Sequence, residues 1–330
     1  MLEYRPKLFS EASKSHASKN IFVIILCFLA VFCVILLLES IVTLIFALKP
    51  MVEELQKQGY LDSGQGISFG ESMKLSIRVS SAPKIMIPSL LSTVFGTLAS
   101  IFYCRCIEMR PVRSMGARKK GFFPMYFSGL AAGLIMMSFI ALISACLGIT
   151  HIKLCSNINF GVLALFFIGF VVQGMSEEFI FRGYLMTTIG GSGRHTAIAV
   201  GISALGFALA HVGNPGFGPL PFVNLFLFGV FAALCVILSD NIWGACAIHS
   251  MWNFAQGNIY GISVSGTSDT ESVFRSVPNS THAFLTGGEF GIEGSLLTTF
   301  ILVIGIAMSL FMISKKTTEP AEAAPAEAEQ

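Results

Sequence analysis

Three charged side chains stand inside one of the most apolar stretches of the chain. Glu177, Glu178 and Arg182 lie in the segment 159–189, where most other residues are hydrophobic. An ionised side chain near the middle of a bilayer costs about 2.5–3.5 kcal/mol on insertion scales, so such groups are kept where a bundle interior or a wet cavity receives them. These residues are therefore the first candidates for chemistry.

The spacing of the three residues separates the two glutamates. In a helix, Glu178 and Arg182 are four residues apart on one face and can form an ion pair. At 100° per residue Glu177 points about 140° away from Arg182, so it is predicted to face something else. An unpaired carboxylate in such a setting is suited to acid–base chemistry. The alternative is a purely structural ion pair that only fixes helix packing, but it leaves Glu177 unexplained.

Two histidines in later apolar runs extend this group. His211 follows Phe207 by four residues and Asn253 follows His249 by four, so each pair is predicted to share a helical face. A lone histidine in a membrane is often only a hydrogen-bond partner between helices. At ~1.5 Å per residue, however, Glu177, His211 and His249 lie about 18, 22 and 12 Å from the cytoplasmic ends of their runs, so they can share one layer.

The composition indicates an integral membrane protein. Of 330 residues, 54% are hydrophobic and only 12% are charged, whereas soluble domains carry about 25% charged residues. The formal net charge is +2 and no basic binding segment stands out, so no nucleic-acid partner is predicted. The eight cysteines do not form a disulfide framework, and the isolated pair Cys104 and Cys106 lacks the second pair of ligands that a metal site needs.

Eight apolar runs are long enough, or nearly so, to cross a bilayer core of about 30 Å. We therefore predict an all-α polytopic membrane protein with about eight transmembrane helices. The first run is longer than a bilayer needs, so we expect its Glu39 to approach the far membrane surface. The runs are 21–48, 85–103, 127–148, 159–189, 196–212, 222–238, 241–260 and 295–313.

Basic residues orient these helices, because short loops rich in Lys and Arg stay in the cytoplasm. The loop 104–121 holds six basic residues against Glu108 alone, so it is predicted to be cytoplasmic, and an even number of spans puts both termini there as well. We expect a cytoplasmic arm (1–20), an N-terminal transmembrane region (21–126) with an external loop (49–84), a membrane core (127–313) and a disordered tail (314–330) rich in Ala, Pro and Glu.

At the charged and histidine residues the sequence resembles the CPBP family, which comprises CAAX prenyl endopeptidases and bacteriocin-processing enzymes and is also called the Abi family. The resemblance covers roughly residues 120–313, and TGGEFGIEGS (Thr286–Ser295) is similar to the segment before the last helix of bacterial members. It rests on three ordered motifs: E-E-x-x-x-R at Glu177, Glu178 and Arg182, F-x-x-x-H at Phe207 and His211, and H-x-x-x-N at His249 and Asn253.

The resemblance implies an intramembrane endopeptidase of a bacterial cell membrane, with a catalytic cavity among the helices of the core 127–313. Its substrate would be a membrane-associated peptide or protein. Glu177 would be the general base that activates water, and His211 would help to hold that water. His249 and Asn253 would donate hydrogen bonds to the oxyanion. No cofactor is needed for this mechanism. The structural residues around these four would be Glu178, Arg182 and Phe207.

Other functions remain open at this point. His211, His249 and Glu177 also make a plausible ligand set for zinc, which would give a metalloprotease that uses the same residues. The sequence has no H-E-x-x-H, however, and Asn253 is a poor zinc ligand but a good oxyanion donor. A non-catalytic membrane scaffold or immunity protein is the alternative from another class. The substrate is not indicated: prenylated C-terminal peptides, bacteriocin leaders and pheromones all fit the resemblance.

Overall fold

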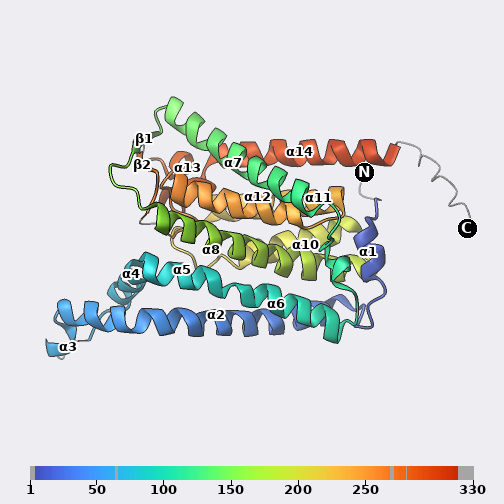
Figure 1. Cartoon of the computed structure of the whole chain (residues 1–330), viewed down its shortest axis with the longest axis horizontal. Helices are drawn as coiled ribbons and strands as arrows, with labels where there is room; N and C mark the ends of the chain where they lie inside the picture. Colours follow the sequence, from blue (N-terminus) through green and yellow to red (C-terminus); the bar gives the residue numbers. More distant parts are fainter. Residues whose placement is uncertain (1–3, 64–65, 268–270, 280, 319–330) are drawn as a thin grey trace, which may run out of the picture.

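The computed structural model describes residues 4–63, 66–267, 271–279 and 281–318. The helices run alongside one another in a bundle, and a small two-stranded sheet lies at one end (Figure 1). Six helical stretches in this part of the chain are long and apolar enough to cross a membrane. They are α2 (Ile21–Lys57), Pro83–Ile107, α7 (Phe122–Cys146), Phe160–Gly191, α11 (Pro219–Ser239) and Leu296–Lys316, the main part of α14 (Leu296–Thr318).

The predicted all-α polytopic membrane architecture is confirmed, and the chain is an integral membrane protein. All eight predicted runs coincide with helices, but the count of eight spans is not confirmed. Two runs fold as shorter helices, α10 (Thr196–Leu209) and α12 (Trp243–Phe254), the latter continued by the π-helical turn η4 (Ala255–Ile259). At 1.5 Å per residue, the 14 residues of α10 extend only about 21 Å. Glycine and proline in the following segment, 213–219, prevent the helix from continuing.

Two of the six stretches contain changes of helix type. Pro83–Ile107 comprises α5 (Pro83–Ser92), α6 (Val94–Phe102) and the π-helical η1 (Tyr103–Ile107). Phe160–Gly191 comprises α8 (Phe160–Glu178), the π-helical η3 (Phe179–Met186) and α9 (Thr187–Gly191). The change from α8 to η3 therefore falls directly after the two adjacent glutamates.

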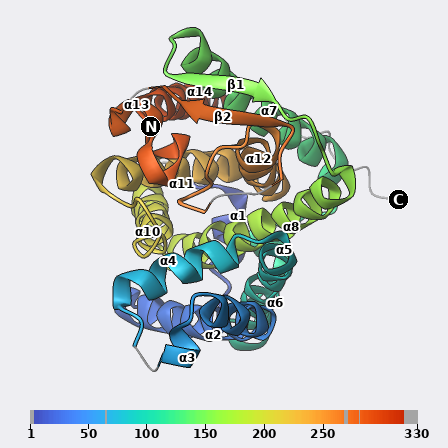
Figure 2. The same ribbon diagram turned by 90° about the vertical axis from the view of Figure 1, so that its left-hand side faces the viewer.

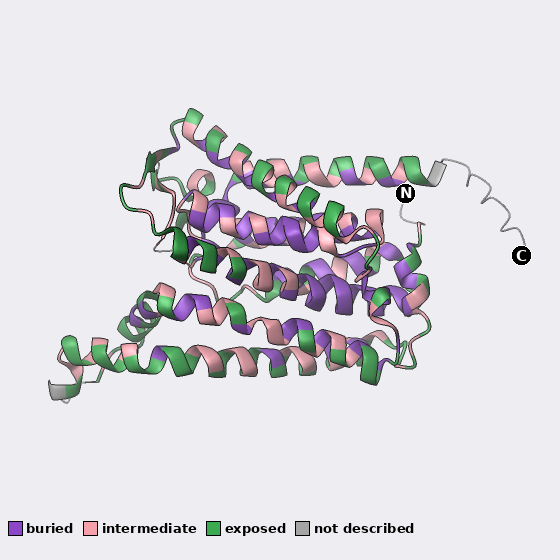
Figure 3. Ribbon diagram, viewed as in Figure 1, coloured by how far each residue is buried: buried purple, intermediate pink, exposed green. Residues whose placement is uncertain are grey.

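The helices form layers around α8. In the end view of Figure 2, α2, α5 and α6 lie on one side of α8, while α12, α7 and α14 lie on the other. Figure 3 shows that the buried residues concentrate in the interior helices, including α8, α10 and α12, while the outer helices carry many exposed positions. Phe22 on α2 is 79% exposed. Apolar side chains on the outside are what a lipid environment requires.

Glycines bring α12 close to its two neighbours. A Cβ added to Gly129 of α7 would lie 2.5 Å from the carbonyl oxygen of Gly244, and one added to Gly174 of α8 would lie 2.6 Å from the backbone nitrogen of Ser250. Real Cβ atoms do not approach so closely, so only glycine permits these contacts. Small residues are the usual means by which membrane helices pack at short range. Ser250 directly follows His249, so this contact sets the distance between His249 and α8.

The N-terminal region contains more helix than the sequence suggested. The arm 1–20 contains α1 (Lys7–Ala12), whose Phe9 is fully buried and packs against Gly190 at the end of α9. The segment 49–84, predicted as a loop, is largely helical. Helix α2 continues past Pro50, α3 (Tyr60–Ser63) follows, and α4 (Phe69–Ser80) begins with a capping box between Ser68 and Glu71.

The C-terminal part adds short elements at the end of the bundle where β1 lies. Strand β1 (Thr150–Leu154) pairs antiparallel with β2 (Phe274–Pro278), with Thr150 opposite Pro278. Before α14 come α13 (Ala283–Thr286) and the 3-10 turns η5 (Gly288–Phe290) and η6 (Ile292–Gly294), while η2 (Val112–Met115) interrupts the basic loop 104–121. Helix α14 runs to Thr318, so the boundary predicted at 314 falls inside a helix, and residues 319–330 lie outside the described part.

Candidate active site

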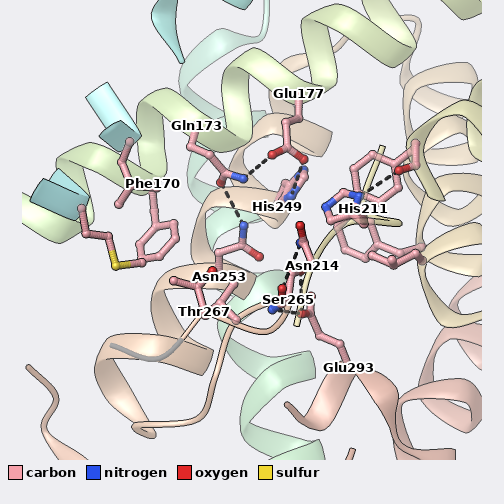
Figure 4. A pocket seen from close by; sticks show the side chains of 16 residues that line it. Phe170, Gln173, Glu177, His211, Asn214, His249, Asn253, Ser265, Thr267 and Glu293 are labelled. Atoms are coloured by element: carbon pink, nitrogen blue, oxygen red, sulfur yellow. Dashed lines mark hydrogen bonds and ion pairs between the residues drawn. The ribbon is translucent and has the colours of Figure 1, made fainter. Parts of the chain in front are cut away.

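The three sequence motifs meet at one cavity of about 160 Å³ inside the bundle. Glu177 comes from the last turn of α8, His211 from the turn after α10, and His249 and Asn253 from α12. Figure 4 shows their side chains around this cavity. The structure therefore brings together all four residues that the sequence predicted as catalytic, from three separate segments.

The predicted ion pair on the fourth apolar run is present. Arg182 donates from Nη1 to Oε1 of Glu178 at 2.8 Å, and both side chains are fully buried. Glu177 does not pair with Arg182, as the helix geometry predicted, although η3 replaces the regular α-helix assumed in that calculation. Single π-helical turns inside α-helices occur frequently at functional sites.

His249 lies between the two glutamates. Its Nδ1 is 2.9 Å from Oε1 of Glu178, and its Nε2 is 3.6 Å from Oε2 of Glu177. The ring is 3% exposed. Glu178 therefore orients the histidine as well as pairing with Arg182, a contact that the sequence analysis missed. With Nδ1–H donated to Glu178, the other ring nitrogen faces the Glu177 carboxylate and the cavity.

A glutamine that the sequence analysis also missed connects Glu177 with Asn253. Gln173, four residues before Glu177 on α8, donates from Nε2 to Oε1 of Glu177. Its Oε1 accepts from Nδ2 of Asn253 at 2.9 Å. An amide supplies both a donor and an acceptor, so one side chain fixes the two groups relative to each other. The only signal in the sequence was a polar residue one turn before Glu177 in an apolar run.

His211 lies just beyond α10 rather than on it, because the helix ends at Leu209. Its Nδ1 is nevertheless 2.8 Å from the carbonyl oxygen of Phe207, and the two rings are 4.9 Å apart. If Nδ1 carries the proton and donates it to that carbonyl, Nε2 remains as an acceptor for a cavity ligand.

The ring of Phe207 contacts several of these groups. The guanidinium carbon of Arg182 lies 4.5 Å from the ring centroid, and the His249 ring is 5.7 Å away in an edge-on arrangement. A cation over an aromatic face is attracted by about 2 kcal/mol when both are removed from water. Phe207 thus covers the buried cation and limits the movement of His249, which fits the structural position predicted for it.

A loop closes another part of the cavity. Ser265, whose φ is 46°, donates from its backbone nitrogen to Oε2 of Glu293 at 2.7 Å and from Oγ to the same oxygen at 3.0 Å. Its carbonyl oxygen accepts from Nδ2 of Asn214 at 2.9 Å. The second Glu293 oxygen accepts from Nε1 of Trp252 at 3.3 Å. Glu293 belongs to the segment Thr286–Ser295, so that segment attaches the loop to α12.

The described side chains do not form a metal site as they are arranged. In the described part of the chain, no group of three His, Cys, Asp or Glu residues could hold a metal ion. Both ring nitrogens of His249 face carboxylates, and Nδ1 of His211 faces a carbonyl oxygen. Cys104 is buried with its sulfur 3.4 Å from the Arg110 carbonyl oxygen, while Cys106 is exposed, so this pair also lacks the geometry of a site.

A comparison with protein families matches the part of the chain that carries these residues. The segment 159–255 matches the family model of type II CAAX prenyl endopeptidase Rce1-like proteins. This match supports the resemblance of the segment to the CPBP family of CAAX-type proteases. The matched segment runs from the start of α8 to the end of α12 and contains all three motifs, which confirms the resemblance seen in the sequence. No curated protein and no solved structure matches the chain. The match supports the function of a CAAX-type intramembrane endopeptidase for this membrane protein.

Proposed function

We propose that this endopeptidase cleaves its substrate with a water molecule activated by Glu177. One observation carries the proposal: the two oxygens of the Glu177 carboxylate differ in their environment. Oε1 accepts a hydrogen bond from Gln173, whereas Oε2 is buried without a hydrogen-bond partner and faces His249 at the cavity. A carboxylate that is held at one oxygen and open at the other is suited to take a proton from a bound water.

The remaining residues fit the later steps. The Nε2 atom of His211 accepts a hydrogen bond from one O–H of the water, Glu177 takes the proton of the other O–H, and the resulting hydroxide oxygen attacks the peptide carbonyl carbon. Negative charge then develops on the carbonyl oxygen and is stabilised by an amide hydrogen of Asn253 and by His249 in its imidazolium form, in which Nδ1 donates to Glu178 and Nε2 donates to the oxyanion. Asn253 has two amide hydrogens and gives one to Gln173, so one remains for the substrate. Glu177 returns its proton to the departing nitrogen as the carbon–nitrogen bond breaks.

Glu178 and Arg182 support this arrangement without touching the substrate. The guanidinium neutralises the buried Glu178 carboxylate, and Glu178 in turn holds Nδ1 of His249. An oriented donor needs no reorganisation when charge develops, which is the main advantage of such sites. Because the donor set does not fit a metal as arranged, none of these steps passes through one.

We also propose that both termini face the cytoplasm of a bacterial cell. Supporting this orientation, α1 contacts the basic loop, since Glu11 lies 3.2 Å from Arg118. Lys315 and Lys316 lie in the last turn of α14, whose end is near the N-terminal arm in Figure 1. A concentration of basic residues on one side favours the cytoplasm for that side.

The test compares membrane peptides from cells that contain wild-type protein, Glu177→Gln, or no protein. We expect fragments that appear only with the wild type. As a matched control, Glu53→Gln changes a half-exposed carboxylate on α2, paired with Lys49 at 3.9 Å, and should give the wild-type fragments. Identical peptide profiles with and without the protein would favour the scaffold function, and fragments that persist in Glu177→Gln would overturn the role of Glu177.

A further inference from the structure

A second cavity, of about 190 Å³, also borders Glu177. One wall comes from α2 and the other from the end of α8, from η3 and from the turn after α10. The two cavities share Glu177, His211 and Asn214 as lining residues. A ligand in the second cavity would therefore lie beside the groups that we assign to the reaction.

Glu39 of α2 lines this second cavity together with Glu177. The sequence led us to expect Glu39 at the far membrane surface, because the apolar run ends at residue 48. The helix itself continues to Lys57, so Glu39 is its middle residue. Its side chain is half-buried rather than at a helix end. Glu39 lies outside the segment that matches the family model.

No positive charge within the described residues balances Glu39. It forms no hydrogen bond or ion pair with them, and neither Lys nor Arg lines the cavity. Arg182 is already paired with Glu178. The rest of the wall is mixed: Phe32, Ile35 and Leu36 line it on the α2 side, and its other lining residues include Thr93, His211 and Asn214. Charges attract strongly in such surroundings because little water screens them.

A second polar group in the cavity also has no partner. Ser176, which borders the cavity next to Glu177, is fully buried, and its hydroxyl has no hydrogen-bond partner. Buried hydroxyl groups are nearly always hydrogen-bonded in native proteins, so an unsatisfied one calls for an explanation. The Glu39 carboxylate, the Oε2 oxygen of Glu177 and the Ser176 hydroxyl at one cavity are complementary to a cation that also carries hydrogen-bond donors.

We propose that Glu39 binds a Lys or Arg side chain of the substrate next to the bond that Glu177 attacks, and so determines specificity. This proposal rests on the proposed function. A side chain fits better than a terminal ammonium group, because an endopeptidase cleaves internal bonds. The stem of a long basic side chain can lie along Phe32 and Leu36 while its charged end reaches the carboxylate.

The first experiment measures selectivity in the full-length protein reconstituted into lipid nanodiscs. Quenched fluorescent peptide libraries are used in three matched forms, with Lys, Gln or Glu beside the varied cleavage region. We expect wild type to cleave the Lys form at least about tenfold more efficiently, in kcat/KM, than the Glu form. Glu39→Gln should bring that ratio toward one, and Glu39→Lys should invert it.

The matched control for selectivity is Glu53→Gln, which removes a carboxylate from the same helix outside the cavity and should keep the wild-type ratio. Unchanged ratios in both Glu39 variants would overturn the proposal. So would cleavage by wild type without any preference among the three peptide forms.

The second experiment does not depend on catalysis. In Glu39→Cys the new thiol is treated with a trimethylammonium methanethiosulfonate or with a sulfonate methanethiosulfonate of similar size, and mass spectrometry measures modification at position 39. We expect the cationic reagent to react at least about tenfold faster, because Glu177 remains in the cavity. Adding Glu177→Gln should lower the ratio of the two reaction rates, cationic over anionic reagent. Val34→Cys, on the exposed surface of α2, should show no such preference.

The two experiments separate the failure of the proposed function from the failure of the cation site. If wild type cleaves no peptide but position 39 reacts selectively with the cation, the proposed reaction is wrong and the cation-binding cavity stands. If peptides are cleaved by way of Glu177 but neither experiment shows a charge preference, the proposed function stands and the role of Glu39 is wrong.

Discussion

The helices that carry the three motifs and the helix α2 hold their charged residues in different ways. In the motif helices, Glu178 contacts both Arg182 and His249, and all three side chains are almost fully buried. On α2, Glu39 has no partner among the described residues. Charged groups in a connected network fix one another's positions, whereas an unpaired carboxylate remains available to a ligand. The comparison suggests that one region holds the reacting groups and the other contributes to recognition.

Loss of the proposed general base, Glu177, should have the largest effect. It is the strictest test of the separation between reacting residues and recognition residues. Glu177→Gln keeps the shape of the side chain and removes its ability to take a proton. We expect kcat to fall by about 10²–10⁴-fold, while the protein stays folded because Glu177 is not part of the Arg182 pair. Steady-state kinetics with a cleaved peptide, together with a thermal melt of purified protein, measures both. A folding defect equal to that of Glu178→Ala would contradict the separation of roles.

Glu178→Ala should act mainly on folding. The substitution leaves the Arg182 guanidinium buried without its carboxylate and also removes the partner of His249. Breaking a buried ion pair by removing one member costs about 3–5 kcal/mol. The folded yield in membranes and the melting temperature in detergent report the loss. Glu53→Ala is the matched control, since its carboxylate is half-exposed and should change the stability little. Wild-type stability in Glu178→Ala would show that the network is not needed for the fold.

Asn253→Ala tests the oxyanion role next to this network. An oxyanion donor acts mainly in the transition state, so its loss costs roughly 100- to 1000-fold in kcat with little change in KM. Asn253 is 4% exposed and borders the cavity, as the shared-site mechanism requires. Because both donors would serve one oxygen, the double variant with His249→Ala should lose less than the sum of the single losses. A raised KM at constant kcat would instead indicate a binding role.

Gln173→Leu should have a smaller effect, because Gln173 holds Glu177 and Asn253 in position but takes no proton itself. Removing the amide frees both Glu177 and Asn253, and we expect kcat to fall by about tenfold, the low end for a lost positioning contact. Gln173→Glu can still accept from Asn253 but places a second negative charge beside Glu177, so it should shift the pH profile of kcat. If both variants kept the wild-type profile, the hydrogen-bonded link would have no role in catalysis.

Chelation should have the smallest effect. Since the proposed mechanism uses a glutamate and no metal, phenanthroline or EDTA should leave kcat unchanged, and purified protein should contain far less than one zinc per chain. Metal analysis of wild type and of His211→Ala checks this. Stoichiometric zinc in the wild type that disappears in His211→Ala would favour the metalloprotease alternative, and the arrangement of His211 and His249 described above would then belong to a metal-free state.

Local patterns in the sequence predicted the parts of the site that lie within one helix. The pairing of Glu178 with Arg182 follows from a four-residue spacing, and the contact between His211 and Phe207 follows from the same rule even though α10 ends before His211. The helical runs were visible because apolar length alone defines them. The number of helices that span the membrane was not visible, since α10 and α12 fold as shorter helices than their apolar runs suggested.

Contacts between distant segments could not be predicted in this way. His249 meets Glu178 across 71 positions, and Gln173 meets Asn253 across 80. Such pairs depend on how α8 and α12 pack, which a single sequence does not indicate. The sheet of β1 and β2 was missed for the same reason. The length of α2 was also missed, because its apolar run ends at residue 48 whereas the helix continues through a polar segment to Lys57.

The close contact at Gly174 limits how the enzyme can admit a peptide. With no side chain between the backbones, α8 and α12 are too tightly packed to slide or separate without losing many contacts. Glu177 and its hydrogen-bonding neighbours are therefore expected to behave as one rigid body during turnover. Any opening for an extended chain must then come from the other walls, either by release of the Ser265 loop from Glu293 or by outward movement of α2. The rate of substrate entry would be set by those walls and not by the residues that break the bond.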